Sequence, residues 1–108
     1  LEYNAGFGAE RAITIPRDAD LANAPKGYSG ASLAALTNLA ARKGYRLVAC
    51  EYSGANAFFL RNDVAPSVAA QPVARAYRPQ MSRLEEETER EGNILEVIAA
   101  RQLPLVEV

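Results

Sequence analysis

The sequence contains no histidine and no tryptophan, and it has only one cysteine and one methionine. Histidine is the commonest general base and the commonest metal ligand in proteins. Its absence excludes a Ser-His-Asp triad, a Cys-His pair and a typical zinc site built from this chain alone. Any chemistry of these 108 residues must use carboxylates, tyrosines, amides or arginines, and we expect no metal site.

The single cysteine, Cys50, lies in the apolar run RLVACEY. A lone thiol cannot form an internal disulfide, which indicates a reducing compartment, and we expect a cytoplasmic location. A nucleophilic cysteine needs neighbouring groups that lower its pKa, and the sequence places none beside Cys50. Cys50 is therefore interpreted as a small buried apolar residue.

An excess of one charge is also missing, since 12 Lys and Arg oppose 13 Asp and Glu, for a formal net charge of −1. Such a chain has no basic excess to attract nucleic acid, and we expect none as a partner. No apolar run is long enough to cross a bilayer, so no membrane partner is expected. The apolar content of 49% and the short length predict one domain with a modest core.

Residues 31–43 are predicted to form a helix, because apolar residues recur along them at helical spacing. Ser29 or Ser32 is placed to cap the start of this helix. Gly44 is placed to end it in the left-handed conformation.

Two strands are predicted after this helix, YRLVACEY over residues 45–52 and AFFLR over residues 57–61. The connection SGAN contains a glycine and has four residues, which is typical of an antiparallel hairpin. Apolar residues alternate onto both faces of the first strand, so we expect that strand to be buried on both sides.

The remaining segments are less regular. Leu1, Glu2 and Tyr3 read like the end of a buried strand, and a long loop with a short strand at AITIP follows. Ser82 and Glu85 have capping-box spacing, and a second capped helix is predicted at NILEVIAA, before the extended tail LPLVEV. Because no strand body precedes Leu1 and the only methionine is at position 81, we expect the C-terminal part of a longer protein.

The order of elements predicts an α/β fold in which a strand, a crossover helix and a second strand form a parallel unit. The run YSGASLAALTNLAARKGYRLVACEYSGANAFFLRND, with EYN upstream, resembles the C-terminal part of the FkbM-like S-adenosylmethionine-dependent methyltransferases. The motifs KGYRLV and NAFFLR carry this resemblance, which covers about residues 1–64. Residues 65–108 are then a proline-containing arm with two short helices and a tail.

The resemblance implies a C-terminal fragment of a Rossmann-like class I methyltransferase sheet: strand end, long loop, helix and antiparallel hairpin, followed by short C-terminal helices. In that family S-adenosylmethionine is held by a Gly-rich turn after the first strand, which would lie upstream of Leu1. NAGFG is the only Gly-rich candidate here, and it opens no predicted helix, so it is interpreted as a loop. We therefore expect this chain alone to bind no cofactor and to be inactive.

Ligands of open parallel sheets sit beyond the carboxyl ends of the strands. Glu2, Tyr3, Asn4 and Tyr28 are therefore candidate residues for binding a methyl acceptor, with the catalytic residues unknown. The alternative interpretation is that Tyr3 packs in the core and Asn4 caps a turn.

A second function remains open, that of a small non-enzymatic α/β interaction or oligomerisation module. An uncovered strand edge invites pairing with another chain. Under either hypothesis we expect a partner across the open sheet edge, which is the remainder of the same protein or a second copy in a homo-oligomer.

Overall fold

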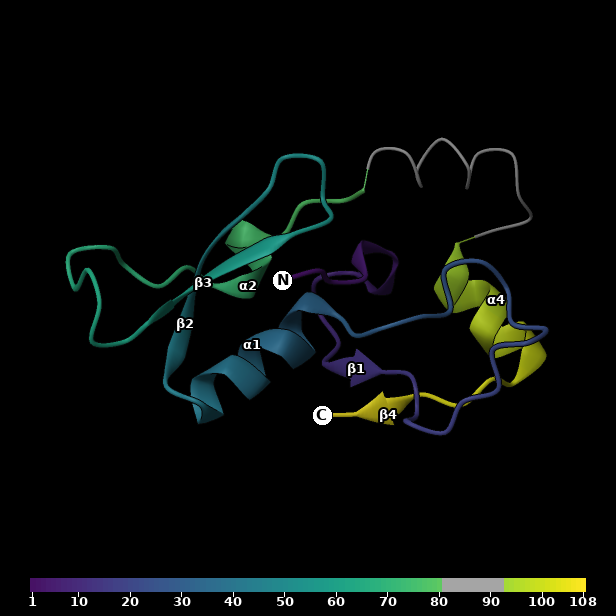
Figure 1. Cartoon of the computed structure of the whole chain (residues 1–108). Coiled ribbons are helices and arrows are strands. Elements are labelled where there is room, and N and C mark those ends of the chain that lie inside the picture. The colour runs from purple at the N-terminus through teal and green to yellow at the C-terminus, as the bar shows by residue number, and fades with distance from the viewer. Residues whose placement is uncertain (81–92) are drawn as a thin grey trace.

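Three α-helices and two short antiparallel sheets form a small mixed α/β domain in this computed structural model, which describes residues 1–80 and 93–108 (Figure 1). The first sheet contains β2 and β3, and the second contains β1 and β4. The predicted capping box at Ser82 and Glu85 lies outside the described residues.

Helix α1 (Leu33–Arg42) confirms the helix predicted for this region. Ser32, and not Ser29, caps it, because the Ser32 hydroxyl oxygen accepts a hydrogen bond from the Ala35 amide. Gly44 follows the helix with φ +84°, the left-handed conformation predicted for it.

The predicted hairpin is confirmed, with β2 (Tyr45–Cys50) paired antiparallel to β3 (Ala57–Arg61). The pairing shifts between Leu47 and Ala49, so Val48 is the extra residue of a β-bulge. This bulge places Leu47 and Cys50 on the same face of the hairpin, and both pack in the first core cluster.

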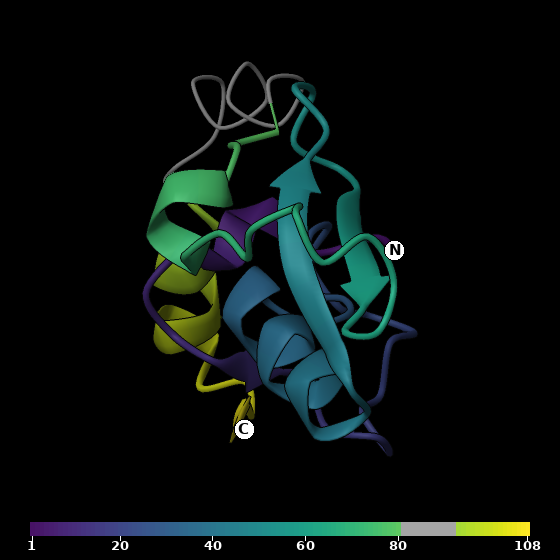
Figure 2. The ribbon, with the colours of Figure 1, turned by 90° about the vertical axis from the view of Figure 1, so that its left-hand side faces the viewer.

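The expectation that β2 is buried on both sides is wrong for this chain. Ala49 is exposed, and its cross-strand partner Phe58 is 52% exposed. Helix α1 and the short helix α2 (Val73–Ala76) both contribute buried residues to the one core cluster that holds Leu47. The described helices therefore leave the outer face of the hairpin uncovered (Figure 2).

The N-terminal segment pairs with the other side of β3. Glu2 forms an antiparallel bridge with Asn56, and the Ala57 amide donates to the Leu1 carbonyl at 2.7 Å. Because β2 and this segment are both antiparallel to the strand between them, they run parallel to each other. Helix α1 belongs to the stretch of chain that connects them.

The second sheet joins distant parts of the chain. Strand β1 (Ile13–Thr14) lies within the AITIP segment predicted as a strand, and it pairs antiparallel with β4 (Val106–Glu107) from the predicted extended tail. Thr14 also bridges Ala31, just before α1. The sequence pattern did not predict the pairing of β1 with β4.

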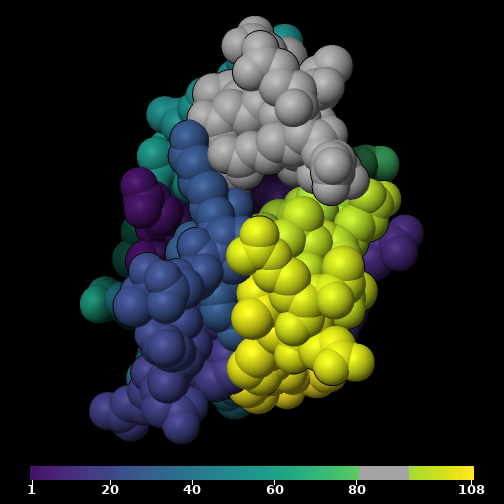
Figure 3. All heavy atoms as spheres, turned by 90° about the vertical axis from the view of Figure 1, so that its right-hand side faces the viewer, coloured from purple at the N-terminus to yellow at the C-terminus, as the bar shows by residue number. Residues whose placement is uncertain are grey.

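A second core cluster lies under the C-terminal helix α4 (Ile94–Arg101), which Asn93 caps as predicted. Ile94 and Ile98 pack there with buried residues of the N-terminal loop, namely Phe7, Ile13 and Tyr28. Figure 3 shows the C-terminal residues in yellow lying directly beside the blue loop that precedes α1. The long loop is therefore ordered by packing against the end of the chain.

Candidate functional site

A polar hollow of about 250 Å³ opens at the end of the N-terminal segment. It is bounded by that segment, the loop before α1, the hairpin turn and the residue that follows Pro79. Its lining residues are Glu2, Tyr3, Asn4, Ser29, Gly30, Ala31, Ala55 and Gln80. The structure thus brings together three of the four predicted site residues.

Tyr3 lies at the floor of this hollow and is almost fully buried. Its hydroxyl donates a hydrogen bond to the Arg78 carbonyl at 2.6 Å and accepts one from the Arg78 amide at 3.2 Å. Burial raises the pKa of Tyr3 to about 12, and the hydrogen bond with the Arg78 backbone opposes that rise. Tyr3 therefore stays protonated at neutral pH and joins the N-terminal segment to the chain after α2.

Asn4 is also buried, and its side chain organises two loops. Its amide nitrogen donates to the carbonyls of Gly27 at 2.7 Å and Ser29 at 2.8 Å. Its side-chain oxygen accepts from the Gly6 amide and so caps the 3-10 helix η1 (Ala5–Phe7). This geometry agrees with the interpretation of Asn4 as a turn cap.

Glu2 differs from both neighbours because it is exposed. Among the described residues that line the hollow, Glu2 alone carries a charge. A carboxylate can accept hydrogen bonds from several donors at once. Of the four predicted residues, only Glu2 has an exposed side chain that a ligand can reach.

Tyr28 lies apart from the other three predicted residues. It is 4% exposed within the second core cluster, and its hydroxyl donates to the Pro104 carbonyl at 2.6 Å. Ser29, the next residue, lines the hollow in its place. The contact with Pro104 spans 76 residues of sequence, so no local pattern could have indicated it.

The Gly-rich segment NAGFG does not form a cradle for a cofactor. Its amides are used within the loop: Gly6 donates to the Asn4 side chain, Phe7 to the Asn4 carbonyl and Gly8 to the Ala5 carbonyl. An open Gly-rich turn would leave such amides for a ligand. The structure corrects the interpretation of NAGFG as a loop, because Ala5–Phe7 form one turn of 3-10 helix whose amides are bonded within the segment.

Cys50 is half-buried against the first core cluster. Burial raises the pKa of the Cys50 thiol, and the nearby Tyr3 hydroxyl and Arg78 charge only partly oppose that rise. A protonated thiol is a poor nucleophile and a poor metal ligand. Within residues 1–80 and 93–108, no three His, Cys, Asp or Glu side chains lie together as a metal site.

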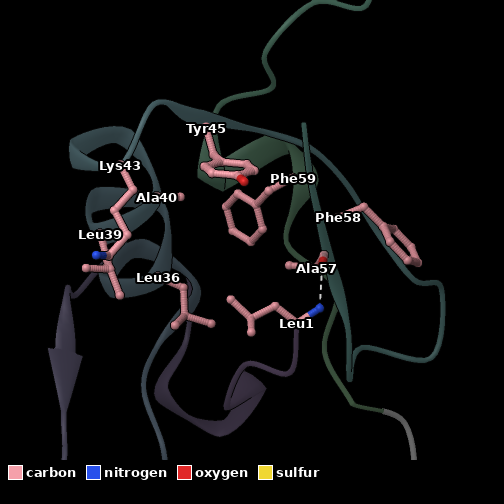
Figure 4. A pocket seen from close by; sticks show the side chains of 9 residues that line it. All are labelled: Leu1, Leu36, Leu39, Ala40, Lys43, Tyr45, Ala57, Phe58 and Phe59. Atoms are coloured by element: carbon pink, nitrogen blue, oxygen red, sulfur yellow. Dashed lines mark hydrogen bonds between the residues drawn. The ribbon is translucent and has the colours of Figure 1, made fainter. Parts of the chain in front are cut away.

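A second, apolar hollow lies between α1 and the hairpin and is called the groove below (Figure 4). It encloses about 390 Å³, and its lining residues are Leu1, Leu36, Leu39, Ala40, Lys43, Tyr45, Ala57, Phe58 and Phe59. Figure 4 shows Tyr45 and Phe59 projecting toward α1, whereas the ring of Phe58 projects away from the groove. The sequence pattern does not indicate this groove, apart from the leucines of α1 that line it.

No protein-family model matches the chain, and no curated protein or solved structure is significantly similar to it. The described helices also include none with the length and apolar character that a membrane span requires.

Proposed function

We propose that this chain is the C-terminal part of an S-adenosylmethionine-dependent methyltransferase with a Rossmann-like class I sheet. In this proposal it supplies the far edge of the sheet and one wall of the acceptor site. The observation that carries the proposal is the polar hollow at the carboxyl end of the N-terminal segment. The resemblance of residues 1–64 to FkbM-like methyltransferases supports the same class.

The strand arrangement supports this proposal. The N-terminal segment and β2 run parallel, with β3 antiparallel between them. In open α/β sheets, ligands bind outside the carboxyl ends of parallel strands. Tyr3 lies at the end of the N-terminal segment, Ala55 lies in the turn that follows β2, and both line the hollow.

The lining of the hollow restricts the acceptor. Glu2 is its one charged residue, and Ser29 and Gln80 add neutral polar groups. A carboxylate attracts hydroxyl and ammonium donors and repels phosphate and carboxylate groups. The proposal is therefore a hydroxyl-bearing acceptor that is uncharged or cationic. Since the amides of Gly6, Phe7 and Gly8 are bonded within their own segment, the proposal assigns cofactor binding to another part of the protein.

The test uses the complete product of the gene, isolated with a tag after Val108. We expect its mass to exceed 11.6 kDa and expect it to bind S-adenosylmethionine. Glu2→Gln should lower kcat/KM for a hydroxyl acceptor about tenfold, because a charged hydrogen bond is replaced by a neutral one. The affinity for S-adenosylmethionine should be unchanged.

Glu10→Gln is the matched control, because Glu10 is also exposed but does not line the hollow. It should leave kcat/KM within about twofold of the parent value. A gene product that binds no S-adenosylmethionine would contradict the proposed class. An active product in which Glu2→Gln behaves like Glu10→Gln would contradict only the placement of the acceptor.

We propose self-association as a second candidate function, because the groove gathers exposed apolar side chains. Leu39 and Tyr45 are each 40% exposed, and both line the groove. Lys43 has the one charged side chain among the lining residues. Burying such a surface against the same surface of a second copy leaves few charges unpaired.

Sedimentation equilibrium of the 108-residue chain should then show a dimer. Leu39→Glu should raise the dissociation constant at least about tenfold, because it places a carboxylate in the apolar contact. Leu21→Glu is the control, since Leu21 is 53% exposed and lies outside the groove. A monomer at high concentration, or equal effects of both substitutions, would exclude the groove as the contact.

A further inference from the structure

Residues 62–71, called the strap below, leave β3, cross in front of β2 in Figure 2 and lead into α2. Every residue from 62 to 70 is exposed. Val64 and Val68 are 42% and 41% exposed, so the apolar side chains of the strap do not hold it in place. Polar contacts must therefore position it.

One side chain supplies most of these contacts. Arg46 on β2 donates hydrogen bonds to four backbone carbonyls, those of Arg61 at 2.9 Å, Val64 at 3.0 Å, Ala65 at 2.7 Å and Val68 at 3.0 Å. The guanidinium has five N–H donors in a rigid plane, so it can bind several carbonyls at once. A lysine ammonium has a single centre and cannot reach all four carbonyls together.

The backbone of the strap is shaped around this guanidinium. Ala65 has φ +46°, in the left-handed region that residues other than glycine rarely adopt. Its carbonyl makes the shortest of the four bonds to Arg46. A charged donor strengthens such a bond and compensates for the unfavourable conformation of Ala65.

The strap also covers the free edge of β2. The Gln71 amide donates to the Leu47 carbonyl at 2.8 Å, on the edge of β2 that does not face β3. Beyond the strap, the outer face of the hairpin is uncovered at Ala49 and Phe58, which are both exposed. An open strand edge beside exposed apolar side chains is a ready site for pairing with another strand.

We propose that the strap is an edge guard, latched by Arg46, that prevents β2 from pairing with β2 of a second copy. Opening the latch frees the Leu47 carbonyl on this edge. Identical edges then pair antiparallel about a two-fold axis and extend the sheet across both copies. This inference does not depend on the proposed enzymatic function.

The test compares Arg46→Gln with Arg61→Gln in the 108-residue chain. Both remove one positive charge, but among the described residues the Arg61 side chain pairs only with exposed Asp63, at the start of the strap, and with none of the carbonyls that Arg46 binds. In Arg46→Gln, hydrogen exchange of the Gln71 amide should accelerate at least about tenfold, and self-association should exceed that of the parent at equal protein concentration. In Arg61→Gln both should stay within about twofold of the parent. Arg46→Lys should behave like Arg46→Gln, because an ammonium keeps the charge but cannot reach the four carbonyls together.

Unchanged exchange at Gln71 in Arg46→Gln would overturn the latch. Faster exchange of the Gln71 amide without self-association beyond that of the parent would overturn the claim that the strap guards the edge of β2. If Arg46→Gln does not fold, amide hydrogen exchange of the parent chain in low urea tests the latch instead. The amides of Val64, Val68 and Gln71 should then open together, well before the β2–β3 amides. Exchange of Gln71 only through global unfolding would overturn the proposal.

Discussion

Replacement of Gly54 by alanine is expected to lower the free energy of unfolding by about 4 kcal/mol. Gly54 lies in the hairpin turn with φ +80°, where a β-carbon is already strained. A β-carbon at this position would also overlap the backbone of Pro79 and Gln80. Backbone atoms cannot rotate away as a side chain does, so either the β2–β3 hairpin turn or the segment after α2 must shift.

Gly30→Ala separates the two causes of this effect. Gly30 also has a positive φ, +63°, but no atom lies within 4 Å of the position its β-carbon would occupy. The Gly30→Ala variant should therefore lose only the conformational part of the free energy of unfolding, about 1 kcal/mol. Urea denaturation of both variants measures the difference. Equal losses for Gly54→Ala and Gly30→Ala would mean that the segment after α2 does not press on the hairpin turn in solution.

The same contact links stability to the candidate site. Ala55 and Gln80 both line the polar hollow. Ala55 is the residue after Gly54, and Gln80 is the residue after Pro79, whose backbone lies against Gly54. The close approach at Gly54 therefore sets the distance between two walls of the hollow. A glycine in a hairpin turn is expected from the sequence, but its contact with residues 25 positions further along is not.

Local elements were predictable from the sequence because their determinants are local. Helix α1 has apolar spacing, a serine cap and a terminal glycine within a single run, and the hairpin has a glycine in its turn. The bulge at Val48 was not predictable, since nothing in RLVACEY distinguishes a regular strand from a bulged one. That one residue decides which side chains of β2 face the core.

The candidate site was predictable in part for the same reason. Glu2, Tyr3 and Asn4 come together because consecutive residues at a strand end share one edge of the sheet. Tyr28 lies elsewhere because it packs against α4 and bonds the Pro104 carbonyl. This position depends on packing between opposite ends of the chain. The groove depends on the angle at which α1 packs against the hairpin, and no local sequence pattern indicates that angle.

Substitution of Ser32 by alanine is expected to cost about 3 kcal/mol of stability. The Ser32 hydroxyl is fully buried and accepts two hydrogen bonds, from the Ala35 amide at 3.2 Å and the Ile13 amide at 3.0 Å. Loss of the first removes a helix cap, worth about 1 kcal/mol. Loss of the second leaves a buried amide of β1 without its partner, which costs about 1–3 kcal/mol.

Asn93→Ala is the matched control, because Asn93 also caps a helix through its side chain but is exposed. Water can replace the lost bond there, so the expected loss is about 1 kcal/mol. If urea denaturation gives equal losses for both variants, the Ile13 amide must find another partner. A larger loss for Ser32→Ala means that one hydroxyl joins α1 to β1. Since α1 belongs to the first core cluster and β1 to the second, this hydroxyl would then couple the two clusters.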